Sequence, residues 1–275
     1  MTRLFLAILA LLFSVSVSFA EIVPLDQGLD ASAMVIRAER DGLWEKTLVV
    51  RFPSHRRVLG TSDGFLDACA AINHAAHPEL WLKAEKLSKD SRTCGGKLYL
   101  EQVREATAGR LGISVKELAH MGTAADMDHR AVVTRKYEQF TVTALVTAGA
   151  KSNAIRTGTD EGTAVEPDNG PAGTVNIIIL TNARLSDAAM ARAIITVTEA
   201  KTAAFEDLLV PSSYTKGVQA TGTGTDSIII VSGNSGPKVT YTGGHSRIGD
   251  LIGRAVHEAV VEALGRQNGF SRKRK

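Results

Sequence analysis

Two near-continuous apolar runs constrain the fold of this chain more than any other feature of its sequence. They are TVNIIILTNA at 174–183 and SIIIV at 227–231, and such runs are typical of strands covered on both faces. Apolar residues recur at helical spacing between them, from Ser186 to a stop at Pro211, and again over 243–264. The order strand, helix, strand, helix predicts an α/β fold, a layered mixed sheet with flanking helices.

Both predicted helices begin at a serine that can cap the first turn, Ser186 in the first helix and Ser246 in the second. Within the first helix, Lys201 falls on the same helical spacing as Phe205. Glu199 has apolar or small neighbours one turn away, so it is either partly buried, as a general base would be, or part of a solvated face.

The N-terminal half predicts a meander of short strands at 34–39, 47–52 and 57–60, with turn residues between them. Two helical regions are expected to follow, at 64–77 and 98–112. The meander therefore precedes the layered core.

A Thr- and Val-rich alternation over 139–149 predicts a further strand. The next segment, 153–173, is crowded with Gly, Asp, Asn and Pro and predicts a long loop. Long loops without a strand or helix of their own are often functional, so this loop is a candidate lid over a binding site.

The first twenty residues have the three-part layout of a secretory signal peptide, with Arg3 before an apolar stretch that ends in Ser-Phe-Ala. We expect an exported, periplasmic protein with a single domain over 21–268 and no further segment apolar enough to span a membrane. The tail 269–275 ends in RKRK and is expected to be a basic, disordered end. Without leader and tail the body is slightly acidic, which argues against a nucleic-acid partner.

The chain has two cysteines, Cys69 and Cys94. An oxidising compartment would favour a disulfide between them over a cysteine nucleophile. Their spacing matches neither a redox CxxC pair nor a zinc quartet.

The segment ATGTGTDSIIIV, 220–231, resembles a phosphate-binding loop only at first sight. It lacks the lysine of such a loop and precedes a strand instead of joining a strand to a helix. It concentrates hydroxyl and carboxyl groups beside a buried strand, at Thr221, Thr223, Thr225 and Asp226. A glycine-assisted turn would explain the same residues, so the functional interpretation needs support from elsewhere in the chain.

Three further side chains have groups that could accept a proton, bind a metal or hydrogen-bond to an amide. His245 lies just before a predicted helix, where the helix dipole favours a neutral imidazole, although an exposed turn histidine would look the same. Asn153 and Asn182 flank strand ends, where they either hydrogen-bond a substrate amide or cap turns.

Four blocks follow one another along the chain, namely VTAGAKSNAIRTG (146–158), GTVNIIILTNARLSDAAMARAIITVTEAKTAAF (173–205), ATGTGTDSIIIV (220–231) and YTGGHSRIGDLIGRAVHEAVVEAL (241–264). Together they strongly resemble the adenosylcobinamide amidohydrolase family, and RFPSHRRVLGTSDG with HMGTAADMD resembles it more weakly. The resemblance implies hydrolysis of the amide between a corrin propionate arm and its aminopropanol linker. The products would be adenosylcobyric acid and 1-amino-2-propanol, so the expected ligand is a corrinoid.

The chemistry of amide hydrolysis leaves three versions of the site open. In the first, Asp226 or Glu199 activates water, His245 protonates the leaving amine, and Asn182 with the loop amides of 221–225 holds the oxyanion. In the second, Thr221 or Thr223 is a nucleophile. In the third, a divalent metal is bound by Asp226, Glu199 and His245.

Export is unusual for an enzyme whose product feeds biosynthesis inside the cell. Either corrinoids are remodelled in the periplasm, or the exported chain is a non-catalytic corrinoid-binding protein on the same scaffold.

Overall fold

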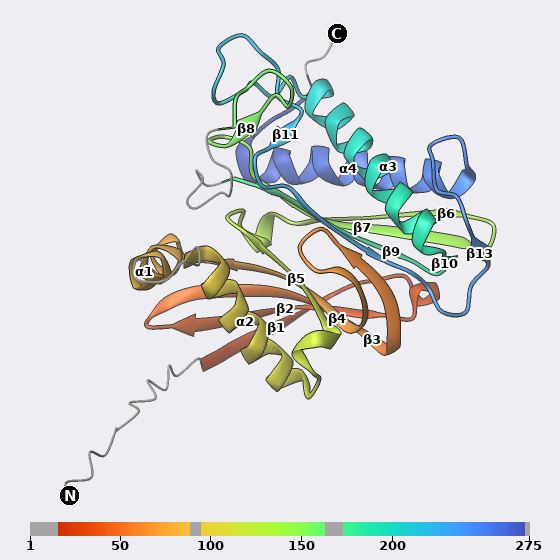
Figure 1. The fold of residues 1–275 in the computed structure, drawn as a ribbon, viewed down its shortest axis with the longest axis horizontal. Helices are drawn as coiled ribbons and strands as arrows, with labels where there is room; N and C mark the ends of the chain where they lie inside the picture. Colours follow the sequence, from red (N-terminus) through yellow and green to blue (C-terminus); the bar gives the residue numbers. More distant parts are fainter. Residues whose placement is uncertain (1–15, 89–94, 163–172, 273–275) are drawn as a thin grey trace, which may run out of the picture.

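The computed structural model describes residues 16–88, 95–162 and 173–272, and its centre is a curled, mixed sheet of nine strands (Figure 1). Across these residues, no helix combines the length and apolar character that crossing a membrane requires. Along the sheet the strands are β1 (Ser16–Val23), β2 (Ser32–Arg40), β3 (Leu43–Gly60), β12 (Ser227–Val231), β9 (Val175–Thr181), β7 (Phe140–Ala148) and β6 (Ala131–Tyr137), while β4 (Gly64–Ala76) pairs with β3 and β5 (Leu118–Thr123) pairs with β4.

Helices cover the outside of this sheet in two groups (Figure 1). The smaller elements are two short strand pairs and three single-turn 3₁₀ helices. The helices are α1 (Pro78–Ser88), α2 (Gly95–Leu111), α3 (Asp187–Asp207) and α4 (Arg247–Asn268). The short elements are β8 (Ala154–Ile155) with β11 (Gly222–Thr223), β10 (Arg184–Leu185) with β13 (Lys238–Val239), and η1 (Gln27–Leu29), η2 (Val115–Glu117) and η3 (Met127–His129).

The two apolar runs form β9 and β12, which lie side by side and parallel, with Ser227 paired to Asn176. Successive side chains of a strand point to opposite faces of the sheet. In β9, Ile177 and Ile179 accordingly pack under α3 and α4, whereas Ile178 points into the curl. The prediction of strands covered on both faces is confirmed, and so is the layered α/β architecture.

Both serine caps are confirmed. The hydroxyl of Ser186 accepts from the backbone N–H of Ala189 at 3.2 Å, and α3 begins there. The hydroxyl of Ser246 accepts from the N–H of Gly249 at 3.1 Å and begins α4. Each bond satisfies a backbone donor that the first helical turn leaves free.

The predicted helix at 64–77 is wrong, because this segment forms β4 between β3 and β5. Its small residues are buried on both faces, with Ala71 inside the curl and Ile72 under α1 and α2. A short apolar run buried on both faces cannot be told from a helix by periodicity alone. The predicted helix at 98–112 is confirmed as α2.

The strands predicted at 47–52 and 57–60 are one continuous strand, β3, and the turn expected between them is an irregularity in its pairing. The register with β4 shifts between Arg51 and Arg56. An extended segment with unpaired residues is typical of a bulge, which bends a strand without ending it.

Three separate apolar cores hold the layers together. One fills the inside of the curled sheet, one lies between the sheet and α3 with α4, and one lies between the sheet and α1 with α2. The inside core includes Leu48 and Leu145, and the core under α3 and α4 includes Phe205 and Met190.

Four sequence-based expectations fall on or beside residues that the structure does not describe. One is the basic tail, of which 273–275 lie outside the described residues. Of the predicted leader, residues 1–15 lie outside the described residues, whereas 16–20 form the first part of β1. Cys69 is a free cysteine and Cys94 lies outside the described residues, so the structure does not support their disulfide. Of the candidate lid, 153–173, residues 163–172 likewise lie outside them.

Candidate functional site

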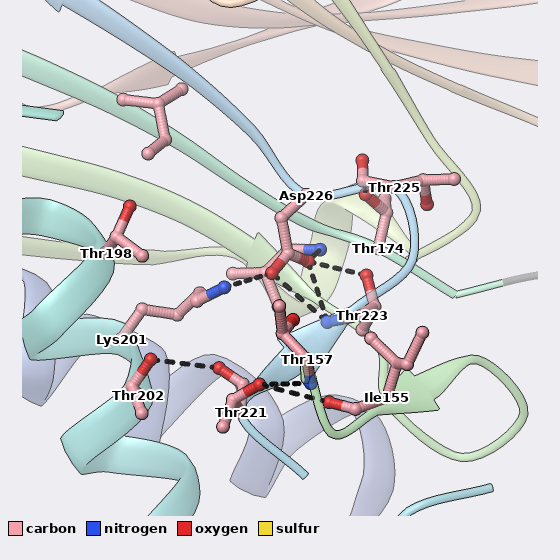
Figure 2. Close-up of polar contacts among 12 residues, drawn as sticks. Ile155, Thr157, Thr174, Thr198, Lys201, Thr202, Thr221, Thr223, Thr225 and Asp226 are labelled. Atoms are coloured by element: carbon pink, nitrogen blue, oxygen red, sulfur yellow. Dashed lines mark hydrogen bonds and ion pairs between the residues drawn. The ribbon is translucent and has the colours of Figure 1, made fainter. Parts of the chain in front are cut away.

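Polar side chains gather where β9 and β12 begin, and Asp226 is at their centre (Figure 2). Its carboxylate accepts hydrogen bonds from the backbone N–H of Val175 at 3.0 Å and from that of Thr223 at 3.1 Å. The Thr223 hydroxyl donates to the same carboxylate at 2.5 Å. The loop that precedes β12 is thus folded around its own aspartate.

Lys201 reaches this carboxylate from α3 and forms an ion pair with it (Figure 2). Both side chains are largely buried, with 10% of Lys201 and 14% of Asp226 exposed. A charge removed from water is tolerated when a partner and further hydrogen bonds compensate it, as they do here. The sequence placed Lys201 on the same helical spacing as Phe205 but gave no sign of its partner.

Gly222 is required by the close approach of this ion pair. A Cβ atom at this position would collide with Lys201 Nζ and Asp226 Oδ2. Gly224 lies next to Asn153, whose Oδ1 would be 3.1 Å from an added Cβ. The alternating glycines of TGTGTD therefore make room for side chains instead of cradling a phosphate.

A buried network of amides and hydroxyls adjoins the loop. Asn176 Nδ2 donates to Asn73 Oδ1 at 2.9 Å, and Asn73 Nδ2 donates to the Thr147 hydroxyl at 2.9 Å. The Thr174 hydroxyl hydrogen-bonds to Asn176 Oδ1 at 3.2 Å and to the carbonyl of Thr225 at 2.7 Å, which joins the network to the loop. Sequence reasoning missed this network, since its members come from separate strands.

Asn153, predicted to bind substrate, is buried and holds loops together. Its Nδ2 donates to the carbonyl of Gly173 at 2.8 Å, and its Oδ1 accepts from the Tyr214 hydroxyl at 2.8 Å. The Thr225 hydroxyl donates to the same carbonyl of Gly173 at 2.9 Å. Asn153 and Thr225 thus lie at the site as parts of its frame.

Thr221 is also part of the frame (Figure 2). Its hydroxyl accepts from the N–H of Thr157 at 3.0 Å, and its carbonyl accepts from the Thr202 hydroxyl at 3.0 Å. The loop amides expected to hold an oxyanion are partly engaged, because the N–H groups of Thr221 and Gly224 donate to the carbonyls of Ile155 and Asn153.

Asn182 lies at the opposite end of the sheet. Asn182 follows the last residue of β9, whereas Asp226 directly precedes the first residue of β12. The two strands run parallel and start at the same end of the sheet, because Ser227 pairs with Asn176. The seven residues of β9 span about 20 Å. Asn182 instead holds the start of β7, where its Oδ1 accepts from the N–H of Thr141 at 2.9 Å.

His245 is exposed and also lies far from Asp226. The last residue of α4, Asn268, accepts from the N–H of Ala150 at 2.8 Å, so the C-terminal end of this helix is near the start of β9. His245 precedes the other end of this helix of 22 residues, which is about 33 Å long. The structure does not bring the two residues together.

Glu199 is exposed on α3, two residues from Lys201. Asp226, Glu199 and His245 therefore do not converge, and neither the water-activating version nor the metal version of the site has the geometry it requires. The version with a threonine nucleophile stays a candidate, because the Thr223 hydroxyl donates to Asp226 and Lys201 pairs with the same carboxylate. A nucleophile of this kind needs a neighbouring base that a third group orients.

Comparisons with known proteins point to the same family as the four sequence blocks. An uncharacterized protein of Methanocaldococcus jannaschii is 42% identical over 245 residues, which cover 84% of this chain and 91% of that protein. The adenosylcobinamide amidohydrolase of Methanosarcina mazei is 32% identical over 60% of this chain and 74% of its own length. That of Halobacterium salinarum is 29% identical over 41% of this chain and 45% of its own. The sequence profile described as adenosylcobinamide amidohydrolase matches residues 31–272, and the chain therefore belongs to this family.

Proposed function

We propose that this protein hydrolyses the aminopropanol amide of adenosylcobinamide to give adenosylcobyric acid and 1-amino-2-propanol. Family membership supports the substrate class and the reaction type. The observation that carries the assignment of the site is the Thr223, Asp226 and Lys201 cluster, which lies in two of the blocks that resemble the family.

In the reaction we propose, Thr223 Oγ attacks the amide carbonyl while its proton passes to Asp226. The C–N bond then breaks and the leaving amine takes this proton, which leaves the corrin propionate as an ester of Thr223. Water attacks the ester, releases the carboxylic acid and restores the threonine hydroxyl. Lys201 is a positioning residue in this scheme, because it fixes the carboxylate that moves the proton.

We place this reaction in the periplasm, since the first twenty residues have the layout of a cleaved leader. Corrinoids would then be remodelled before uptake. The mature chain would begin at Glu21, whose carboxylate forms ion pairs with Arg37 and Arg130.

One observation favours a second candidate, a corrinoid-binding protein without activity. Asp226 accepts from Val175, Thr223 and Lys201 together, and such a carboxylate also suits a purely structural loop. Binding and catalysis differ in one measurable product, the released amine.

The test is incubation of purified protein with adenosylcobinamide, with 1-amino-2-propanol quantified by mass spectrometry. We expect release by the wild type and a loss of about a thousandfold or more in Thr223→Val, which keeps the side-chain shape and removes the nucleophile. Thr198→Val is the matched control, because Thr198 is exposed on α3 and its hydroxyl donates within its own helix, to the carbonyl of Ile194.

Two results would contradict parts of the proposal. Normal release by Thr223→Val would exclude the threonine nucleophile. Tight binding of adenosylcobinamide with no release by the wild type would establish the binding protein instead.

A further inference from the structure

Three neighbouring elements far from the Lys201 and Asp226 pair bring a histidine, a cysteine and a glutamate together. Cys69 lies on β4 between two residues that pair with β3, namely Ala68 with Arg56 and Ala70 with Arg51. It is therefore opposite the irregular part of β3, where the extra residues 52–55 are placed. The irregularity brings His55 beside Cys69.

Glu117 reaches the same place from the other side of β4. It directly precedes Leu118, the residue of β5 that pairs with Ala70. Its conformation is fixed by a capping box, in which Glu117 Oε2 accepts from the backbone N–H of Ser114 at 2.7 Å. The carboxylate is thus held beside Cys69 by local hydrogen bonding.

His55 is oriented by two contacts. Its Nε2 lies 2.5 Å from Glu117 Oε1, and its carbonyl accepts from Asn234 Nδ2 at 2.8 Å. Asn234 Nδ2 also donates to the Ser54 hydroxyl at 3.0 Å. The segment of β3 that carries the histidine is therefore tied to the loop after β12.

One ligand atom from each of His55, Cys69 and Glu117 lies within 4.8 Å of the other two. In a tetrahedral zinc site, bonds of about 2.0 to 2.3 Å place the ligand atoms about 3.3 to 3.8 Å apart. The contact of 2.5 Å between His55 Nε2 and Glu117 Oε1 would have to open to this spacing when an ion binds between them. We propose that His55, Cys69 and Glu117 bind a divalent transition metal ion of the zinc type, with a fourth position open to solvent.

The donor set and its surroundings fit such an ion. Imidazole, thiolate and carboxylate are all zinc ligands, and a thiolate disfavours magnesium or calcium. His55 is 56% exposed, so an ion can enter from solvent.

This site is separate from the proposed amidohydrolase site. His55 precedes Val58, which pairs with Val231 at the end of β12, whereas Asp226 lies before the start of that strand. The metal proposal therefore stands or falls independently of the amide chemistry.

The experiment is a titration of the reduced, tag-free protein with Co²⁺, followed by displacement with Zn²⁺. We expect one equivalent of Co²⁺ to bind with a thiolate-to-cobalt charge-transfer band that Zn²⁺ removes. Cys69→Ser should abolish the band, and His55→Ala should weaken Zn²⁺ binding by about tenfold or more. Cys94→Ser and His77→Ala are the matched controls, because both variants keep the three ligands and His77 lies outside β4, directly after its last residue.

Circular dichroism of each variant verifies that the fold is kept. The proposal is overturned if the reduced wild type shows no charge-transfer band. It is equally overturned if folded Cys69→Ser retains the band, or if Cys94→Ser loses it.

Discussion

Asp226 has two functions that mutation of the residue itself cannot separate. Its carboxylate folds the loop through Thr223 and Val175 and also compensates the buried charge of Lys201. Removing one partner of a buried ion pair leaves the other uncompensated and costs about 3 to 5 kcal/mol. Asp226→Asn would therefore lower stability and activity together, and Thr223→Val is the more informative probe of chemistry.

Gly222→Ala tests the packing of this ion pair without changing any charge. The added methyl group collides with Lys201 Nζ and Asp226 Oδ2, and we expect unfolding free energy to fall by about 1 to 3 kcal/mol. Displacing the pair should also reduce kcat/KM by about a hundredfold. Chemical denaturation and the amine-release assay measure the two effects.

Gly244→Ala is its control, because a Cβ atom at that position meets open space. This variant should stay within about 0.5 kcal/mol of wild type. Equal stability and activity in Gly222→Ala would show that the ion pair does not pack against residue 222 in solution.

At the scale of elements, the sequence predicts those strands and helices whose residue pattern is compatible with only one type of secondary structure. The isoleucine runs of β9 and β12 and the serine caps of α3 and α4 are of this kind. β4 was mistaken for a helix because small residues are compatible with either structure. The pairing of Lys201 with Asp226 depends on how α3 packs against the loop before β12, and no local pattern contains that information.

The interface between β4 and α2 contains a buried histidine that should make stability depend on pH. The hydroxyls of Thr47 and Tyr99 flank the two ring nitrogens of His74 at 2.8 and 3.0 Å. Burial, assisted by Arg40 and Arg110, lowers the pKa of His74 from 6.5 to about 3. The unfolded chain therefore binds a proton that the folded chain excludes between these two pH values.

Folding stability should then be complete above about pH 6.5 and fall as the pH drops toward 3, by up to about 1.4 kcal/mol per pH unit from this residue. Carboxylates such as Asp63, whose pKa is lowered by His120 against the opposing effect of burial, add to acid instability, so the comparison must be between variants. His74→Gln keeps hydrogen-bonding groups but does not titrate, and its urea-unfolding free energy should depend less on pH. Identical slopes for the two proteins would refute this assignment.

At the scale of the whole molecule, the N-terminus shows which part of the chain the fold needs. Residues 16–20 pair with β2 at the edge of the sheet, and Phe19 is 57% exposed. Farther along, Val23 and Leu29 are buried in the core inside the curl. Cleavage after Ala20 would leave that core intact.

A chain that begins at Glu21 should accordingly fold and keep its activity, with a Tm lowered by no more than about 4 °C, which corresponds to about 1 kcal/mol. A chain that begins at Asp30 loses the buried Leu29 and should be destabilised by several times as much. Thermal unfolding followed by circular dichroism measures both. A large loss of Tm in the first truncation would show that residues 16–20 belong to the mature fold, and would contradict cleavage after Ala20.

β3 has a further consequence for how this molecule can be assembled. It pairs with β2 and β4 on its two sides and, through residues 58–60, also with β12, which comes from the last quarter of the chain. During synthesis, β3 is therefore complete long before β12 has been made. Until then, the backbone groups of residues 58–60 that pair with β12 have no partner. A chain divided in the turn between β6 and β7 would give two fragments, and each would lack a strand that its own strands pair with. We expect neither fragment to be stable alone, and we expect structure to be recovered only when the two are mixed.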